Sequence, residues 1–215
     1  MTSRPKGNKL YLFDNSYRQQ GYKLIAGVDE AGRGPLAGPV VAAAVILMEK
    51  ADLPGIDDSK KLTQKQRERA FKLVLESSLA VGVGIVAPGE IDRINILQAS
   101  LKAMNYAICS LNLRPDLVLI DGNKIPRGLP KGLKPEEARA VVAGDSLSLT
   151  VASASIIAKC LRDSLMRGYH NDFPGYGFDR HKGYGTKFHI AALNKYGPCA
   201  IHRRSFEPVK SLLGA

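Results

Sequence analysis

Acidic residues follow three apolar stretches of the chain, each at a point where a strand is expected to end. These acids are Asp29 and Glu30 after Ile25–Val28, Asp121 after Leu117–Ile120, and Asp145 after Ala140–Gly144. Catalytic and ligand groups of α/β sheets gather at the carboxyl ends of strands, so these four carboxylates are expected to converge if the strands are neighbours. Carboxylates packed together repel one another unless cations neutralise them, and Mg²⁺ and Mn²⁺ favour such oxygen ligands. Two ions about 3.5–4 Å apart can hold the attacking and leaving oxygens of a phosphodiester displacement, so the pattern indicates nuclease-like chemistry.

A second interpretation of each acid stays open, because Asp at a strand end also starts turns and caps helices. Asp145, which precedes Ser146, fits a helix cap best, whereas glutamate at position 30 is not favoured either in a turn or at a cap. Adjacent strand residues point to opposite faces, so Asp29 and Glu30 can serve one site only if the strand bulges or ends there. The nearby Gly27 and Gly32 permit either.

Strands and helices that would position these acids can be assigned from the apolar pattern. Pro39–Leu47 and Ala80–Val86 are typical of buried strands, and Ala140–Val142 of a short one. We expect helices over Leu62–Ser78, over Pro88–Leu111 as a pair, and over Thr150–Arg167, with a loop over Asn123–Arg139. The expected inward side chains are Leu62, Phe71, Leu75 and Leu79, and the expected outward ones are Lys159, Arg162 and Arg167. Hairpin strands followed by alternating strands and helices predict a mixed-sheet α/β domain.

The charge of the chain points to a polyanionic partner. The 215 residues carry a formal net charge of +11, and 45% of them are hydrophobic, which suits one folded domain. From Lys159 to Ala215, ten Lys or Arg residues stand against four acids, and aromatic residues are interleaved with them. Basic and aromatic residues together suit phosphate contacts and stacking, although several of these aromatics must form a local core.

Several other classes of protein are disfavoured. The chain has no Gly-Lys dipeptide, so it lacks a P-loop, and Cys199 with His202 would supply only half of a zinc site. The cysteine count is odd and no CxxC occurs, which favours a reducing compartment. The longest apolar run, Val40–Met48, is too short to span a membrane. We therefore expect a soluble, cytoplasmic protein with no membrane partner and with a flexible basic arm over residues 1–20.

The combination of motifs resembles the type 2 ribonucleases H, and specifically the bacterial ribonuclease HII family. The resemblance covers about Tyr22 to Val209 and begins with the segment IAGVDEAGRGPLAGP at Ile25–Pro39. The other matching blocks, in family order, are Asp58–Leu62, Asn95–Ser100, Ile120–Asn123, Gly144–Ser146, Ala152–Asp163, His181–Thr186 and His202–Phe206. Ala143 departs from the pattern, since members often carry Lys there, and the loop Asn123–Ala143 is a few residues long for the family.

The resemblance implies a ribonuclease H-like mixed five-stranded sheet flanked by helices, in one catalytic domain over residues 21–215 whose C-terminal part, from about residue 165, is helical. It implies hydrolysis of RNA paired with DNA, and nicking 5′ of single ribonucleotides in duplex DNA, giving 3′-hydroxyl and 5′-phosphate ends. It assigns Asp29, Glu30, Asp121 and Asp145 as catalytic ligands of two Mn²⁺ or Mg²⁺ ions. For substrate it implies that Gly32, Arg33 and Gly34 bind the 2′-hydroxyl, that Tyr184 stacks on the sugar at the junction, and that Ser59, Lys60 and Lys61 lie near backbone phosphates.

Two alternatives remain beside this reading. One is a non-catalytic module that binds RNA/DNA hybrids on the same fold. The other is an enzyme like ribonuclease HIII, which would be expected to carry a sizeable N-terminal substrate-binding domain that about twenty residues before Tyr22 cannot form. We expect the protein to act as a monomer.

Overall fold

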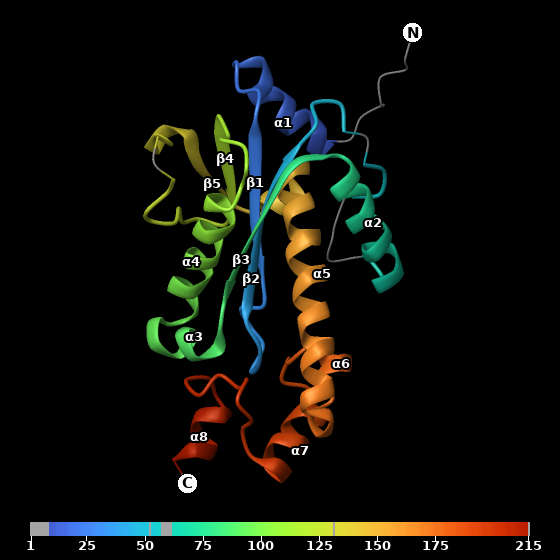
Figure 1. Cartoon of the computed structure of the whole chain (residues 1–215), viewed down its shortest axis with the longest axis vertical. Coiled ribbons are helices and arrows are strands. Elements are labelled where there is room, and N and C mark those ends of the chain that lie inside the picture. Colours follow the sequence, from blue (N-terminus) through green and yellow to red (C-terminus); the bar gives the residue numbers. More distant parts are fainter. Residues whose placement is uncertain (1–8, 52, 57–61, 131, 215) are drawn as a thin grey trace.

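A mixed sheet forms the centre of the molecule. The computed structural model describes residues 9–51, 53–56, 62–130 and 132–214, and within them five strands form one sheet (Figure 1). The strands are β1 (Ile25–Ala31), β2 (Val40–Leu47), β3 (Ser78–Val86), β4 (Leu117–Asp121) and β5 (Ala138–Val141). Their order is β3-β2-β1-β4-β5, with β2 antiparallel to β1 and β3, and β4 parallel to β1 and β5. The predicted mixed five-stranded α/β sheet is confirmed.

Helices cover both faces of the sheet and continue beyond one end of it. Figure 1 shows α4 on one side of the sheet and α5 on the other, with the short C-terminal helices gathered at the lower end. The helices are α1 (Lys9–Gln19), α2 (Gln64–Glu76), α3 (Pro88–Ile94), α4 (Ile96–Cys109), α5 (Leu149–Asp172), α6 (Phe178–His181), α7 (Lys187–Tyr196) and α8 (Val209–Leu213). The predicted helical C-terminal part is therefore present.

Strand β2 is apolar throughout because both of its faces are covered. Ala42 and Ala44 belong to the core cluster on the α4 side, whereas Ala43 and Val45 belong to the cluster on the α5 side. Side chains alternate along a strand, so a central strand between two helical layers reads as a continuous apolar run. The same alternation on β1 sends Ala26 and Val28 toward α4, which leaves Asp29 on the α5 side.

Helix α5 lies in direct backbone contact with β1, two residues before Asp29. A Cβ atom at Gly27 would lie 2.1 Å from the backbone carbonyl carbon of Thr150, so only glycine fits there. The start of α5 is capped by Ser148, whose side chain accepts a hydrogen bond from the Val151 N–H at 3.2 Å. This contact sets where the α5 side chains stand relative to the end of β1.

The expected flexible arm is helical over residues 9–19, so that expectation does not hold there. In α1, Leu10 and Asp14 are buried, and the Asp14 carboxylate accepts a hydrogen bond from the Thr150 N–H at 2.9 Å. A carboxylate at the start of α5 is also favoured by the helix dipole. The hydrogen-bond partner of Asp14 lies 136 residues away in the sequence, so no local pattern predicts that α1 is attached to α5. Residues 1–8 lie outside the described residues.

Some side chains face the other way from the prediction. Leu75 of α2 is 44% exposed, and Leu79, which lies in β3 and not in the helix, is 43% exposed; the buried residues of α2 are Ala70 and Val74. Arg162, expected to face outward from α5, is fully buried. The apolar stripe of α2 is narrow because this helix covers only one margin of the α5 layer. In the described part of the chain, no helix is long and apolar enough to cross a membrane.

The Gly27 contact gives a stability prediction. Gly27→Ala should lower the free energy of unfolding by at least about 2 kcal/mol, because α5 must move away from β1 or the strand must distort. Urea unfolding in EDTA measures this. The matched control is Gly168→Ala within α5. No atom lies within 4 Å of the added methyl there, and the higher helix propensity of alanine should stabilise the protein by up to about 1 kcal/mol. Equal stabilities for the two variants would contradict the close contact.

Candidate active site

The carboxyl ends of β1 and β4 open into a pocket of about 400 Å³. It brings together most of the site residues predicted from the sequence, which come from β1, the loop after it, β4 and the C-terminal part. The lining residues are Asp29, Glu30, Ala31, Gly32, Arg33, Gly34, Arg67, Asp121, Ser155, Lys159 and Tyr184. Ser59, Lys60 and Lys61 lie outside the described residues, so their predicted phosphate contacts stay a prediction.

Asp29 and Glu30 share this pocket although they are adjacent in a strand. Strand β4 pairs with β1 only as far as Val28, opposite Ile120, so β1 continues past its neighbour at the two acids. Asp121, the last residue of β4, has the same alternation as Asp29 and lies on the α5 side of the sheet. The strand neither bulges nor ends at the two acids, because β1 stays paired with β2 as far as Ala31. Both acids line the pocket because the edge of β1 that faces β4 is open from Asp29 onward.

The carboxylates of the pocket are held in an unfavourable electrostatic environment. Burial raises the pKa of Asp29 well above its usual range, and the charges of Glu30 and Asp121 raise it further, against opposing hydrogen bonds that include one from Ser155. Burial also raises the pKa of Glu30, although the Arg33 guanidinium 3.3 Å from its Oε1 opposes the shift. A cation bound among these groups would remove both costs.

Asp145 lies beside this cluster on a different element. It is 5% exposed and sits in a 3₁₀ turn, Gly144–Ser146, just before α5. The Gly144 N–H donates to Oδ1 of Asp121 at 2.7 Å, which ties that turn to the end of β4. The N-cap of α5 is Ser148, so the helix-cap interpretation of Asp145 is wrong. Asp145 is not among the lining residues of the pocket.

The loop from Gly32 to Pro39 is held by two buried guanidinium groups. Arg203 donates to the carbonyls of Gly32, Arg33 (2.8 Å) and Gly38 (3.0 Å). Because the carbonyl and the following N–H of a trans peptide point in opposite directions, this arrangement turns the N–H groups of Arg33 and Gly34 away from Arg203. The loop therefore presents backbone donors on the side opposite its anchor.

Arg162 holds the same loop from α5. It donates to the carbonyls of Ala37 (3.1 Å) and Pro39 (2.9 Å) and to that of Lys182 (3.0 Å). Gly32 has φ of +103°, and a Cβ there would lie 2.1 Å from Nε of Arg162, so both conformation and space require glycine. Burial lowers the pKa of Arg162 and Arg203, which nevertheless remain charged at neutral pH.

Tyr184 stands at the rim of the pocket, 43% exposed and within reach of the glycine loop. A Cβ at Gly34 would lie 3.7 Å from its Cε1, so ring and loop are neighbours. The Nζ atom of Lys159 lies 5.8 Å from the ring centroid, and Lys159 also pairs with Asp163 at 2.7 Å. An exposed aromatic face beside fixed cations suits contact with a sugar or base of nucleic acid.

Four lining residues of the pocket are not among the predicted site residues: Ala31, Arg67, Ser155 and Lys159. Ser155 and Lys159 stand four apart on α5, and Asp163, which pairs with Lys159 and approaches Arg67 at 3.8 Å, is four further along. This spacing puts the three on one face of the helix, and it is the signal that could have found them, although Lys159 alone is expected to face outward. Arg67 of α2 carries no comparable signal, since the folding of α2 against α5 alone brings it to the pocket.

The donor set suits a divalent cation. Asp29, Glu30 and Asp121 supply only oxygen ligands, and Mg²⁺ or Mn²⁺ would relieve both the cost of burying Asp29 and Glu30 and the repulsion from Asp121. Among the described residues, no three acidic, histidine or cysteine side chains lie close enough together to form a complete metal shell as they stand. The three carboxylates line one pocket but are not yet gathered into such a shell.

Comparison with known proteins defines first the class and then the family. The crystal structure of the ribonuclease H2 from Pyrococcus horikoshii OT3 is 29% identical and matches with a TM-score of 0.72, covering 87% of this chain and 96% of that one. The crystal structure of Bst-RNase HIII in complex with Mn²⁺ has a TM-score of 0.72 and 18% identity, covering all of this chain and 75% of that one, and shows the fold alone. The sheet and the helices around it are therefore those of a ribonuclease H-like protein.

The particular family follows from the sequence comparisons. The family model for ribonuclease HII matches residues 26–209. A ribonuclease HII of Geotalea uraniireducens (strain Rf4) is 55% identical over 202 residues, which cover 94% of this chain and 90% of the relative. The chain belongs to the ribonuclease HII family, and is a metal-dependent endoribonuclease that acts on RNA/DNA hybrids.

The raised pKa of Asp29 makes a prediction about stability. At a pH below the pKa that Asp29 has in the unfolded chain, its carboxyl is protonated in both the folded and the unfolded protein. Burying it then costs no electrostatic free energy. As pH rises through the folded pKa, the ionised form is disfavoured only in the folded protein, and stability is lost. Metal-free Asp29→Asn should therefore melt about 3 °C or more above the unsubstituted protein at pH 8, with the gap closing toward pH 4.

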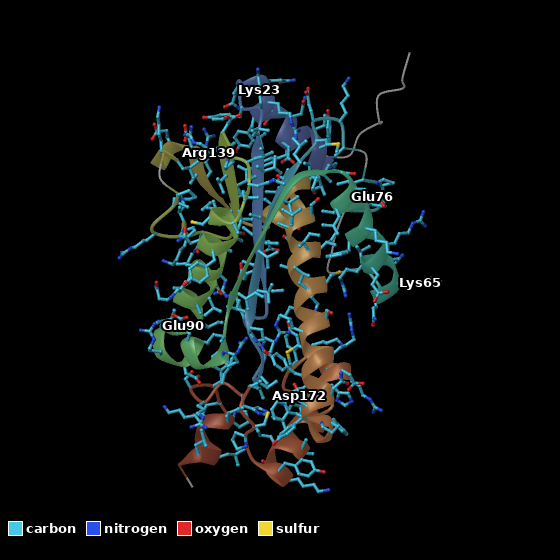
Figure 2. All side chains as sticks on the ribbon, in the orientation of Figure 1. Lys23, Lys65, Glu76, Glu90, Arg139 and Asp172 are labelled. Atoms are coloured by element: carbon cyan, nitrogen blue, oxygen red, sulfur yellow. The ribbon has the colours of Figure 1, made fainter. Side chains whose placement is uncertain are left out.

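Thermal melts in EDTA at several pH values test this. Added Mn²⁺ should raise the melting temperature of the unsubstituted protein more than that of Asp29→Asn. Asp172→Asn is the matched control, since Asp172 is exposed at the end of α5 (Figure 2) and should melt unchanged. A lower melting temperature for Asp29→Asn at pH 8 would contradict the proposed repulsion.

Proposed function

We propose that this protein, besides acting on RNA/DNA hybrids, nicks 5′ of single ribonucleotides in duplex DNA, and that it leaves 3′-hydroxyl and 5′-phosphate ends. The observation that carries the proposal is one pocket that holds buried carboxylates, a backbone loop with outward N–H groups and an exposed tyrosine. Cleavage needs the first of these features, and selection of a ribonucleotide among deoxyribonucleotides needs the other two.

The carboxylates Asp29, Glu30, Asp121 and Asp145 would hold two Mn²⁺ or Mg²⁺ ions in the catalytic complex. Such ions, when bound, supply an activated water nucleophile and stabilise the charge that develops on the leaving 3′-oxygen. The chain supports this by keeping the ligands preorganised: Ser155 hydrogen-bonds to Asp29, and the Gly144 N–H holds Asp121. The Mn²⁺ named with Bst-RNase HIII makes that ion a sensible first probe.

The loop Gly32–Gly34 would read the 2′-hydroxyl, which is what distinguishes RNA from DNA at a given sugar. Arg203 holds the carbonyls of Gly32 and Arg33 inward, so the next two N–H groups face away from it. Glycine at these positions lets a sugar approach the backbone closely. Tyr184, beside Gly34, would stack on the sugar at the RNA–DNA junction, and Lys159 would contact a flanking phosphate.

We further propose a monomer acting in the cytoplasm, with one catalytic domain over residues 21–215. A single chain carries the whole pocket, and Cys109, Cys160 and Cys199 are free thiols, as suits a reducing compartment.

The first activity prediction concerns the metal ligands. Asp29→Asn should lower turnover of a duplex holding one ribonucleotide at least about a thousand-fold, because a charged ligand is lost, while binding measured in EDTA survives. A labelled duplex incubated with Mn²⁺ or EDTA tests this, with Asp172→Asn as the control that keeps full activity. Binding without any metal-dependent cutting by the unsubstituted protein would instead support a non-catalytic hybrid-binding module.

The second prediction concerns Tyr184. Removing a stacking ring costs about 1–3 kcal/mol, so Tyr184→Ala should lower kcat/KM about tenfold or more on the single-ribonucleotide duplex, and by no more than that on a long hybrid. Tyr106→Ala is the matched control, because Tyr106 of α4 is also 43% exposed but lies away from the pocket. Small, equal losses on both substrates would assign Tyr184 to packing.

A further inference from the structure

A buried group of imidazoles lies in the C-terminal part, and the chemistry described above gives it no role. His189 and His202 are buried, and the partly buried His181 stacks on His189 with ring centroids 4.4 Å apart. Phe178 meets His189 edge-on, with ring centroids 5.4 Å apart. Charged imidazolium is costly in such surroundings, so the hydrogen bonds must serve neutral rings.

The contacts of His189 determine where its proton lies. Its Nδ1 is 2.9 Å from the carbonyl oxygen of Tyr184, and its Nε2 is 3.0 Å from Nε2 of His202. A carbonyl can only accept, so Nδ1 of His189 carries the hydrogen. A neutral imidazole has one N–H, so Nε2 of His189 must accept, and His202 must donate to it from Nε2.

The same reasoning extends the chain to Cys199. With its hydrogen on Nε2, His202 has a bare Nδ1, which accepts the backbone N–H of Cys199 at 2.9 Å and faces the Cys199 Sγ at 3.1 Å. The donors therefore run in one direction, from Cys199 to His202 to His189 and onto the carbonyl of Tyr184. Every nitrogen of the two rings has a partner.

Protonation would break this chain. A proton added to Nε2 of His189 would set it against the N–H of His202 across the 3.0 Å contact, and a proton added to Nδ1 of His202 would set it against the backbone N–H of Cys199 at 2.9 Å. Burial lowers the pKa of His189 and of His202 to about 4 each, so both rings are neutral near pH 7.

At its far end the chain fixes the backbone of the pocket's tyrosine. The Tyr184 carbonyl also accepts the Thr186 N–H at 2.8 Å, and the Tyr184 N–H donates to the His181 carbonyl at 2.9 Å. His181 also fixes the backbone of the preceding residue, because its Nδ1 accepts a hydrogen bond from the Gly183 N–H at 3.2 Å. Both polar groups of the Tyr184 backbone are thus set by partners that do not touch the pocket.

We propose that His189, oriented by His202 and Cys199, is a positioning residue that holds the Tyr184 ring where it meets the sugar at the RNA–DNA junction. The proposal rests on the proposed function of Tyr184 and deepens it. It assigns ribonucleotide selectivity partly to a hydrogen-bond relay outside the pocket. If the histidines only fill space, their hydrogen-bonding pattern has no bearing on the substrate.

Two amide substitutions separate these roles. The Asn amide nitrogen reaches the place of Nδ1 and can keep the bond to the Tyr184 carbonyl, whereas Gln reaches the place of Nε2 and loses it. On the single-ribonucleotide duplex with Mn²⁺, we expect His189→Gln to lower kcat/KM about tenfold, the cost of one hydrogen bond. His189→Asn should retain most activity. Since Gln is closer to His in volume, a space-filling role predicts the reverse ranking, which would overturn the proposal.

A double-substitution cycle tests whether His189 acts through Tyr184. In a Tyr184→Ala background the stacking ring is already absent, so His189→Gln should cost less than about twofold more. A full tenfold further loss in that background would overturn the proposal. Each loss is the ratio of kcat/KM without and with His189→Gln in the same background. If the unsubstituted protein does not nick a single ribonucleotide, that result contradicts the proposed function and not the hydrogen-bond relay.

The relay itself is measurable without any substitution. Two-bond ¹⁵N–¹H correlations of the imidazole rings at pH 7 should show His189 with its hydrogen on Nδ1 and His202 with its hydrogen on Nε2, both neutral. The same tautomer on both rings, or a protonated ring, would overturn the proposal even if the variants failed to fold.

Discussion

The contact between α5 and β1 at Gly27 is the constraint on which the site depends. With no side chain between them, the helix lies directly on the strand at Thr150, two residues before Asp29. Each turn of α5 beyond that point then reaches a different part of the pocket. Ser155 meets Asp29, Lys159 reaches the pocket and Tyr184, and Arg162 holds the loop that follows β1. A displaced helix would move all of these groups together.

A second constraint is electrostatic, because buried negative charge and buried positive charge lie close to each other, at the end of β1 and under the loop that follows it. Near the end of β1, the buried Asp29 and the partly buried Glu30 lie close to Asp121, and their like charges oppose folding. Beyond them, Arg162 and Arg203 are buried with backbone carbonyls as their hydrogen-bond acceptors. Carbonyl dipoles satisfy the guanidinium donors but leave positive charge under the loop. The acids thus favour a cation, and the loop above the guanidinium groups favours an electron-rich or anionic partner such as a sugar–phosphate backbone.

What the sequence could predict follows from how local each signal is. The strands that carry Asp29 and Asp121 can be predicted because each acid directly follows an apolar run, although β1 continues to Ala31, and the family resemblance adds the loop Gly32–Gly34. The anchoring of α1 by Asp14, the inward turn of Arg162 and the arrival of Arg67 were not readable, since each depends on a partner far along the chain. A basic residue on a helix is ordinarily solvated, so nothing local distinguishes Arg162 from Lys159. Its acceptors exist only once the loop after β1 has folded onto α5.

The C-terminal part is joined too closely to the loop after β1 to act as a separate cap. Ala37 forms a bridge with His202, the Arg203 N–H donates to the Leu36 carbonyl at 2.8 Å, and the Leu36 N–H donates to the Gly183 carbonyl at 2.8 Å. The same segment places Tyr184. The sheet therefore positions the acids that do chemistry, while the C-terminal part positions the groups that would recognise the sugar. Because His202 lies both in the bridge to the loop and in the relay to Tyr184, the two recognition elements share one support, and a shift of either one must be transmitted to the other.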